Sequence, residues 1–221
     1  VQAVNRYRPE MRLPDVEALL LFEVDGNPPG VRWDAEKIAE VVRPLARAVE
    51  WSDEPRRIAA LWEARSLVGA AIGVLRPGSN RAYCGEDLCV PVARIPETLR
   101  AIQEISARYE IPIATYGHIG GGGLHPGHLI DGQDPDERRR VLRVADEIHN
   151  LALRMGGTTT GEHGVGAVRA QYMAREHGPA LEAMRRIKQA LDPRGIMNPA
   201  KIFPDDVPGL TDEPIPRQTT E

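Results

Sequence analysis

Residues 111–130 read IPIATYGHIGGGGLHPGHLI, which is a strand pattern, a run of four glycines and a second strand pattern. The apolar runs at residues 111–116 and 124–130 have the length of strands and are bounded by turn residues. Four consecutive glycines cost backbone entropy and supply no packing, so they indicate a close approach of the chain to another group. We therefore expect a tight reversal between two strands.

Amphipathic helices are predicted on both sides of this stretch. Residues 96–109 and 134–155 both repeat apolar side chains at helical spacing, and the second range is the clearest helical pattern of the chain. Gly156 and Gly157 supply a C-terminal cap for that second helix. The side chains expected to face inward are Leu99, Ile102 and Ile105 in the first helix, and Val141, Ala145, Ile148, Ala152 and Met155 in the second.

The rest of the chain extends this alternation of strands and helices. The apolar run at residues 17–25 is expected to be a buried strand that ends in an Asp-Gly turn. A loop over residues 27–30 should precede a helix that begins at Asp34 and is interrupted at Pro44. The other expected elements are a helix from Pro55, irregular chain at residues 71–83, strands at 87–93 and 158–160, and helices at 168–176 and 179–191.

These elements predict an α+β fold: a ferredoxin-like antiparallel sheet covered by helices, with a C-terminal helical segment. Two such ferredoxin-like units are one way to arrange the strands. A Rossmann fold lacks support, because no G-x-G-x-x-G loop follows a first strand.

Composition excludes several classes of protein. The chain has 221 residues and a formal net charge of -4, and its basic residues are dispersed, which argues against nucleic-acid binding. No apolar run approaches the roughly 18–20 residues of a membrane-spanning helix, and no signal-peptide pattern opens the chain. Cys84 and Cys89 have no second pair, so we expect two inert, reduced thiols. A cytoplasmic location follows, with a membrane-peripheral one left open.

Candidate chemistry lies in two glycine-flanked stretches. If the glycines reverse the chain, His118 and His125 converge on one point, and Glu162 can complete a three-ligand site for a divalent metal such as zinc. His163 is then a general base, since an imidazole with a pKa of about 6.5 suits proton transfer near neutral pH. The alternative for each histidine is a capped residue of a turn.

Other polar residues have less distinctive settings. Arg65 falls on the apolar face of the helix from Pro55, where it either extends its guanidinium to water or grips a substrate carboxylate. His128, His149 and His177 are interpreted as surface or helix residues.

Six segments resemble the C-terminal domain of the FAD-linked oxidase family, which includes D-lactate dehydrogenases, the D subunit of glycolate oxidase and D-2-hydroxyglutarate dehydrogenase. The similarity runs from about Glu17 to Pro204, and the six segments together are highly specific. In chain order they are LLLFEVDG, LWEAR, EDLCVP, GHIGGGGLHP, GGTTTGEHGVG and LDPRGIMNPAKIF.

The resemblance implies a role for each matching residue. His118, His125 and Glu162 would hold a divalent metal, often zinc, and His163 would be the base that faces the flavin. Arg65 would bind the substrate carboxylate. Asn198 and Lys201 would lie near the flavin, in a stretch where Ala200 replaces the family's glycine.

The chain also departs from the family pattern. Its glycine loop stands where the family has His-x-Gly-Asp-Gly-Asn-x-His, so Gly121 and Gly123 replace an aspartate and an asparagine. Gly127 replaces a further asparagine. The ligand residues are kept, whereas polar groups that orient them or the substrate are lost.

The expected function is that of a substrate- and metal-binding domain of a flavin-dependent enzyme that oxidises a D-2-hydroxyacid to the 2-oxoacid. Residues 1–204 would be this domain and residues 205–221 a disordered tail, and FAD would be bound mainly by an N-terminal domain outside this chain, which begins at Val1. The protein alone is therefore expected to be inactive, and a homodimer is left open. The alternatives are a zinc-dependent hydrolase and a degenerate cap domain without activity.

Overall fold

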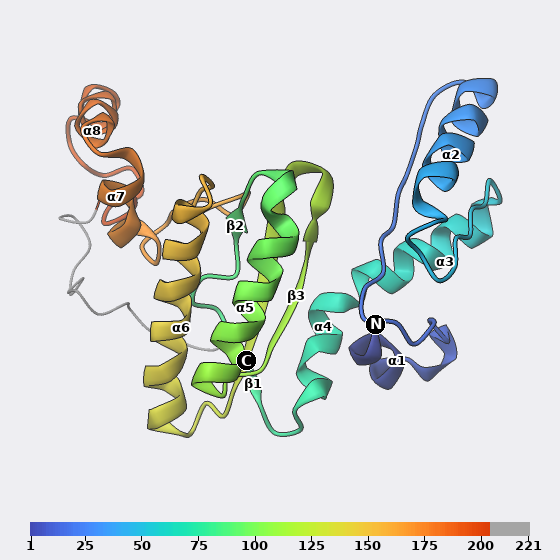
Figure 1. Cartoon of the computed structure of the whole chain (residues 1–221). Helices are drawn as coiled ribbons and strands as arrows, with labels where there is room; N and C mark the ends of the chain where they lie inside the picture. Colours follow the sequence, from blue (N-terminus) through green and yellow to red (C-terminus); the bar gives the residue numbers. More distant parts are fainter. Residues whose placement is uncertain (204–221) are drawn as a thin grey trace. The chain divides into compact units, whose positions relative to one another are not determined.

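A computed structural model of the protein describes residues 1–203, and the chain divides after Leu75 into two compact units (Figure 1). The tail predicted at residues 205–221 lies outside the described residues.

The first unit is built from short helices around a small core. Its core cluster consists of Ala3, Val4 and Ala71, and Ala39, Ala64 and Ile72 are buried as well. The helices are α1 (Gln2–Tyr7), α2 (Pro28–Val42), α3 (Pro55–Ser66) and α4 (Val68–Ala71), with 3-10 turns at Pro9–Met11 and Ile72–Leu75.

Two expectations for the first unit are wrong. Residues 17–25 form no strand, and Leu20 and Phe22 are more than half exposed. A strand needs a neighbour for its backbone hydrogen bonds, and none of the described residues pairs with this segment. Helix α2 begins at Pro28 rather than at Asp34, because the Asn27 side chain accepts a hydrogen bond from the Gly30 N–H and caps it.

The second unit has the element order expected for a ferredoxin-like fold, preceded by one extra strand. Strands β2 (Leu88–Cys89), β3 (Ile113–His118) and β4 (Gly123–Ile130) are joined by helix α5 (Ile95–Tyr109) and a tight reversal. The remaining elements are β1 (Asn80–Ala82), α6 (Pro135–Arg154), α7 (Met173–His177), α8 (Ala180–Leu191), and 3-10 turns at Val92–Arg94, Ile119–Gly121 and Ala170–Tyr172.

The sheet is antiparallel and open, with β4 between β3 on one side and β1 and β2 on the other. Beyond β2, a single bridge pairs Cys89 with Thr158. The order from Thr158 through β2 and β4 to β3 is that of a βαββαβ unit whose last strand is reduced to one residue. The predicted α+β class with an antiparallel sheet is confirmed. The described residues contain one ferredoxin-like unit rather than two.

Several boundaries differ from the prediction because short strands carry little periodic signal. Residues 71–83 contain β1, the strand predicted at 87–93 is limited to β2, and that predicted at 158–160 is limited to the bridge. The helix predicted at 168–176 is a 3-10 turn followed by α7, whereas α5, α6 and α8 lie as predicted.

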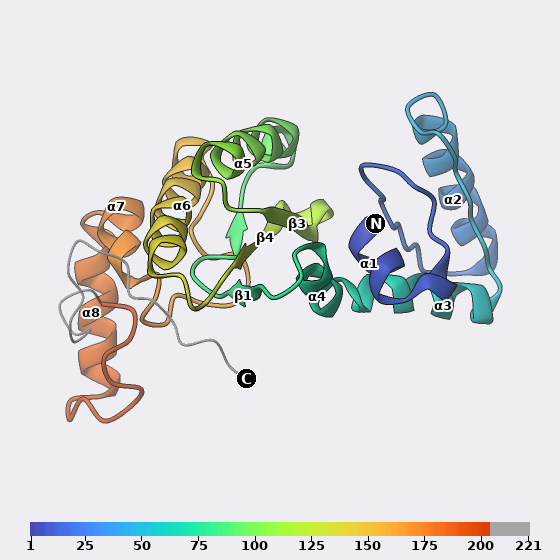
Figure 2. The same ribbon diagram turned by 90° about the horizontal axis from the view of Figure 1, so that it is seen from below.

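Helices α5 and α6 cover the same face of the sheet (Figure 2). Leu124 and Ile130 of β4 pack there against Ile102 of α5 and Ile148 of α6, and all four side chains are buried. Each such burial contributes roughly 1.5–3 kcal/mol. Gly156, with φ +77°, ends α6 in the left-handed conformation that favours glycine.

The strand register assigns His118 and His125 to the opposite face. His118 lies opposite Gly123 and Tyr116 lies opposite His125. Side chains alternate along a strand, so His118, Tyr116 and His125 project from the face that α5 and α6 leave uncovered.

Candidate metal centre

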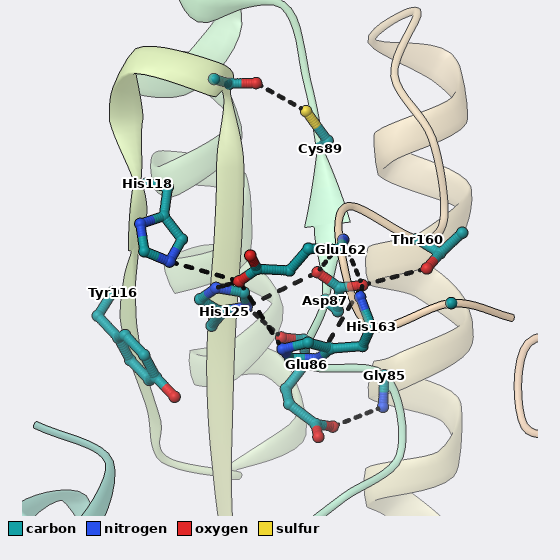
Figure 3. Close-up of polar contacts among 12 residues, drawn as sticks. Gly85, Glu86, Asp87, Cys89, Tyr116, His118, His125, Thr160, Glu162 and His163 are labelled. Atoms are coloured by element: carbon teal, nitrogen blue, oxygen red, sulfur yellow. Dashed lines mark hydrogen bonds and ion pairs between the residues drawn. The ribbon is translucent and has the colours of Figure 1, made fainter. Parts of the chain in front are cut away.

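Three side chains from two distant parts of the second unit meet at one point (Figure 3). The Glu162 Oε1 atom lies 3.1 Å from His125 Nε2 and 3.4 Å from His118 Nε2. The hairpin of β3 and β4 supplies both histidines, and the turn that follows α6 supplies the glutamate. The predicted trio is thus brought together, and its atoms are placed as metal ligands would be.

The hydrogen bonding of His125 determines which of its nitrogens is available. Its Nδ1 atom lies 3.0 Å from the backbone carbonyl of Glu86. A carbonyl oxygen only accepts hydrogen bonds, so Nδ1 carries the proton and Nε2 presents its lone pair to Glu162. His125 Nε2 and Glu162 Oε1 thus face each other at 3.1 Å, an arrangement that either a cation between them or a proton on Nε2 would stabilise.

The donor set fits a divalent transition metal such as zinc. Ligand atoms about 2.0–2.1 Å from a tetrahedral ion lie about 3.4 Å from one another, close to the two distances found here. A pocket of about 170 Å³ opens beside these ligand atoms. A fourth coordination position would therefore be open to substrate or water. The pocket is lined by Asp87, Cys89, His118, Gly121, Gly123, His125, Gly161 and Glu162.

A second group of ligand-type atoms shares His125 with the first. Asp87 Oδ1 lies 3.8 Å from His125 Nδ1, and Asp87 Oδ2 lies 4.0 Å from His163 Nδ1. This group would have to use His125 Nδ1, which already donates to Glu86. The arrangement of His118, His125 and Glu162 therefore fits a metal better.

His163, the predicted base, stacks on His125. Their rings are nearly parallel, 10° apart in orientation, with centroids 5.0 Å apart. The side chain of His163 is half exposed, whereas that of His125 is buried. His163 thus lies next to the three candidate ligands with its ring accessible, as proton exchange with a substrate requires.

Asp87 is the site residue that sequence reasoning missed. It lies just before β2, is completely buried, and accepts hydrogen bonds from the backbone N–H groups of Glu162 and His163. Burial opposes its ionisation, but the backbone hydrogen bonds from His163 and Glu162, together with the charge of Arg169, outweigh that and hold the pKa of the carboxyl below its usual value. A carboxylate directly before an apolar strand was the one signal in the sequence.

The glycine loop allows the hairpin to close around the site. A Cβ atom on Gly122 would lie 2.0 Å from the Val90 carbonyl oxygen, and one on Gly117 would lie 2.1 Å from that of Gly123. The four glycines predicted a close approach to another group. Of these four, Gly122 is the one that approaches another part of the backbone closely. Nothing lies within 4 Å of the Cβ positions of Gly120 and Gly121.

The other predicted site residues lie elsewhere in the chain. Arg65 is an exposed residue of α3, in the first unit, so its relation to the histidines stays a prediction. Asn198 is exposed with φ +48°, and Lys201 is half-buried. Both follow α8, and their predicted proximity to a flavin is likewise untested.

The interpretation as surface or helix residues is wrong for His128 and holds for His149, which is helical. His128 lies in β4 and is fully buried, and burial lowers its pKa to about 4. His149 is helical as expected but also fully buried, and burial lowers its pKa to about 3.

Both cysteines are free, and burial raises the pKa of the Cys84 thiol to about 12, which makes it unreactive.

The family model for the C-terminal domain of FAD-linked oxidases matches residues 1–202. The chain belongs to this family. The glycolate oxidase subunit GlcD of Bacillus subtilis (strain 168) is 38% identical over 192 residues, which are 86% of this chain and 40% of that protein. A probable mitochondrial D-lactate dehydrogenase of Danio rerio is 35% identical over 192 residues, covering 85% of this chain and 38% of that protein.

A more distant relative agrees with this family, and a solved structure shares the fold. The D-2-hydroxyglutarate dehydrogenase of Stutzerimonas stutzeri (strain A1501) is 32% identical over 157 residues, or 69% of this chain and 32% of that protein. The 4-ethylphenol oxidase of Gulosibacter chungangensis matches in fold, with a TM-score of 0.52 at 22% identity over 78% of this chain and 37% of that one. This FAD-linked oxidase domain spans about two fifths of the relatives' length at most.

Among residues 1–203, no single helix is both long and apolar enough to cross a membrane. One bent pair, α3 together with the helical residues up to Leu75, meets that criterion by length and composition alone.

Proposed function

We propose that the full-length parent protein is a flavin-dependent dehydrogenase that oxidises a D-2-hydroxyacid of the lactate or glycolate type to the 2-oxoacid. The observation that carries the proposal is the convergence of His118 Nε2 and His125 Nε2 on Glu162 Oε1, beside a pocket that all three residues line. Membership of the FAD-linked oxidase family supports the reaction class.

The residues of this chain would bind and orient the substrate. His118, His125 and Glu162 would hold a divalent metal, most simply zinc, with the substrate hydroxyl and carboxylate oxygens directed to the open position. Arg65 would pair with the carboxylate. When bound, the metal would polarise the substrate oxygens, and FAD, held mainly by the N-terminal domain and close to Asn198 and Lys201, would accept electrons.

His163 would move the proton. The substrate loses two electrons and two hydrogens in becoming the 2-oxoacid: the hydroxyl proton goes to His163 and the α-hydrogen leaves as hydride to the flavin. The position of His163, half exposed and stacked on the ligand His125, supports this role.

We also propose a reducing, cytoplasmic location, since both cysteines are free, with a membrane-peripheral location as the alternative. A homodimer is a further possibility for its assembly.

Metal content is the first test. The purified parent protein should retain about one zinc ion per chain after dialysis, and His118→Ala and Glu162→Ala should each remove it. Glu182→Ala is the control, because Glu182 is an exposed residue of α8 that pairs with Arg186, away from the ligand trio. Unchanged metal content in the two ligand variants would refute the assignment.

Kinetics of the parent protein with D-lactate and glycolate test the other roles. His163→Ala should chiefly lower kcat, by about 10²–10⁴-fold, as loss of a general base does. Arg65→Ala should chiefly raise KM, since carboxylate binding is largely shared by ground and transition states. Arg56→Ala, on the same helix, is the control for Arg65. Hydrolysis of esters without flavin would instead favour a zinc hydrolase.

A further inference from the structure

We propose that Asp87 is the positioning residue of this metal centre: it does not bind the metal, but holds Glu162 and His163 in place against His125. The inference rests on the proposed function, since it concerns the same site. It assigns a role to a residue that lines the pocket without being one of the three proposed ligands.

The contacts of Asp87 converge on one turn of the chain. Its carboxylate accepts the backbone N–H of Glu162 at 3.1 and 3.2 Å, the backbone N–H of His163 at 2.9 Å and the hydroxyl of Thr160 at 3.1 Å. Its side chain is fully buried. Hydrogen bonds to a buried carboxylate are charge-assisted and stronger than those between neutral groups. The Asp87 side chain therefore fixes three of the four residues 160–163.

These hydrogen bonds replace the missing strand of the sheet. The last strand of the βαββαβ unit is reduced to the bridge at Thr158, so beyond that residue no described ladder supports the chain. Glu162 and His163, which carry the proposed chemistry, come immediately after this point. Gly161 lets the turn approach, because a Cβ atom there would lie 2.9 Å from Asp87 Oδ1. The position of the proposed ligand Glu162 thus depends on Asp87.

Asp87 is poorly placed to be a ligand itself. The nearest nitrogen of His125 is Nδ1, at 3.8 Å, and that atom donates to the Glu86 carbonyl. Both carboxylate oxygens accept hydrogen bonds from the turn that presents Glu162, so the buried charge of Asp87 is stabilised without a cation. Such partners of ligand residues typically contribute 10–100-fold to metal affinity.

The chain provides a matched control in Glu176. This carboxylate is also largely buried and holds the same segment, accepting hydrogen bonds from the hydroxyl of Thr158 and from the backbone N–H and hydroxyl of Thr159. Its contacts end before Gly161. Asp87→Asn and Glu176→Gln therefore make the same chemical change at the same segment, and only the first reaches the turn with Glu162.

The experiment measures zinc affinity of the full-length parent by competition with a chelating dye, together with thermal unfolding without metal. We expect Asp87→Asn to weaken zinc binding about 10–100-fold and Glu176→Gln to change it less than about threefold, although both lower the melting temperature. Thr160→Val, which removes one donor to Asp87 and leaves the carboxylate in place, should weaken binding by a smaller factor and serves if Asp87→Asn does not fold.

Each alternative has its own outcome. Equal losses in Asp87→Asn and Glu176→Gln, or unchanged affinity in Thr160→Val and Asp87→Asn, would overturn the positioning role. A loss as complete as that in His125→Ala would make Asp87 a ligand and would also overturn it. If His118→Ala and His125→Ala themselves leave zinc affinity unchanged, the proposed metal site is wrong. This result is distinct from those that overturn only the positioning role of Asp87.

Discussion

Substitution of Gly122 by alanine should destabilise the second unit far more than the same substitution one residue earlier. Gly122 has φ +80°, and a Cβ atom there would lie 2.0 Å from the carbonyl oxygen of Val90. That part of the backbone cannot move freely, because the Val90 N–H donates to the Gly122 carbonyl at 3.0 Å. Gly121 has open space around its Cβ position and no left-handed backbone.

The size of the effect follows from two separate costs. The left-handed conformation costs a residue with a side chain roughly 1–2 kcal/mol. Forcing a methyl group against fixed backbone costs about 1–3 kcal/mol more. Gly122→Ala should therefore lower the free energy of unfolding by about 2–5 kcal/mol, whereas Gly121→Ala should be neutral or stabilise by up to about 1 kcal/mol through the unfolded state.

Urea unfolding followed by far-ultraviolet circular dichroism measures the difference. With a slope of about 2 kcal/mol per molar urea, the midpoint of Gly122→Ala should lie at least about 1 M below that of Gly121→Ala. Zinc content should fall in parallel in Gly122→Ala, since His118 and His125 flank the loop. Midpoints that agree within about 0.2 M would show that the close approach between Gly122 and Val90 does not exist.

The remaining predictions concern backbone strain and buried histidines. Ala200 has φ +57°, so Ala200→Gly should raise the free energy of unfolding by about 1 kcal/mol, and a fall would contradict that backbone conformation. Burial lowers the pKa values of His128 and His149 to about 4 and about 3, below the unfolded value of about 6.5. Unfolding then takes up protons, so stability should fall as pH decreases from about 6.5 to about 4, by about 1.4 kcal/mol per pH unit for each histidine. His128→Gln should have a smaller slope in urea titrations at several pH values, and an identical slope would refute the buried, neutral state.

Elements with strong periodicity could be predicted from the sequence. Helix α6 buries Val141, Ala145, Ile148 and Ala152, the face that its spacing indicated. The reversal between β3 and β4 also followed from local signals, since four consecutive glycines between two apolar runs indicate a tight turn. Such patterns are local, and a single element contains all the information they need.

Features that depend on distant partners could not be predicted. The apolar run at residues 17–25 has the composition of a strand, but a strand forms only where another edge accepts it. Asp87 is recognisable as a site residue only through its hydrogen bonds to residues more than 70 positions later in the chain. No spacing rule links two positions so far apart.

The buried histidines were overlooked although a signal existed. His128 shares the alternation of β4 with Leu124 and Ile130, which places it on the face covered by helices. His149 lies next to Ile148 and one turn from Ala152, within the buried stripe of α6. Position in the periodic pattern, and not the polarity of the side chain, decides whether these two histidines are buried.

The reduction of the last strand to one bridge affects how the molecule opens. A ladder of backbone hydrogen bonds breaks only when the sheet separates, whereas residues 160–163 are held by side-chain contacts to Asp87. Local opening of this turn therefore requires less free energy than opening of β4, and its amides should exchange with solvent deuterium first. The turn that presents Glu162 and His163 should thus open while β4 stays paired with its neighbours.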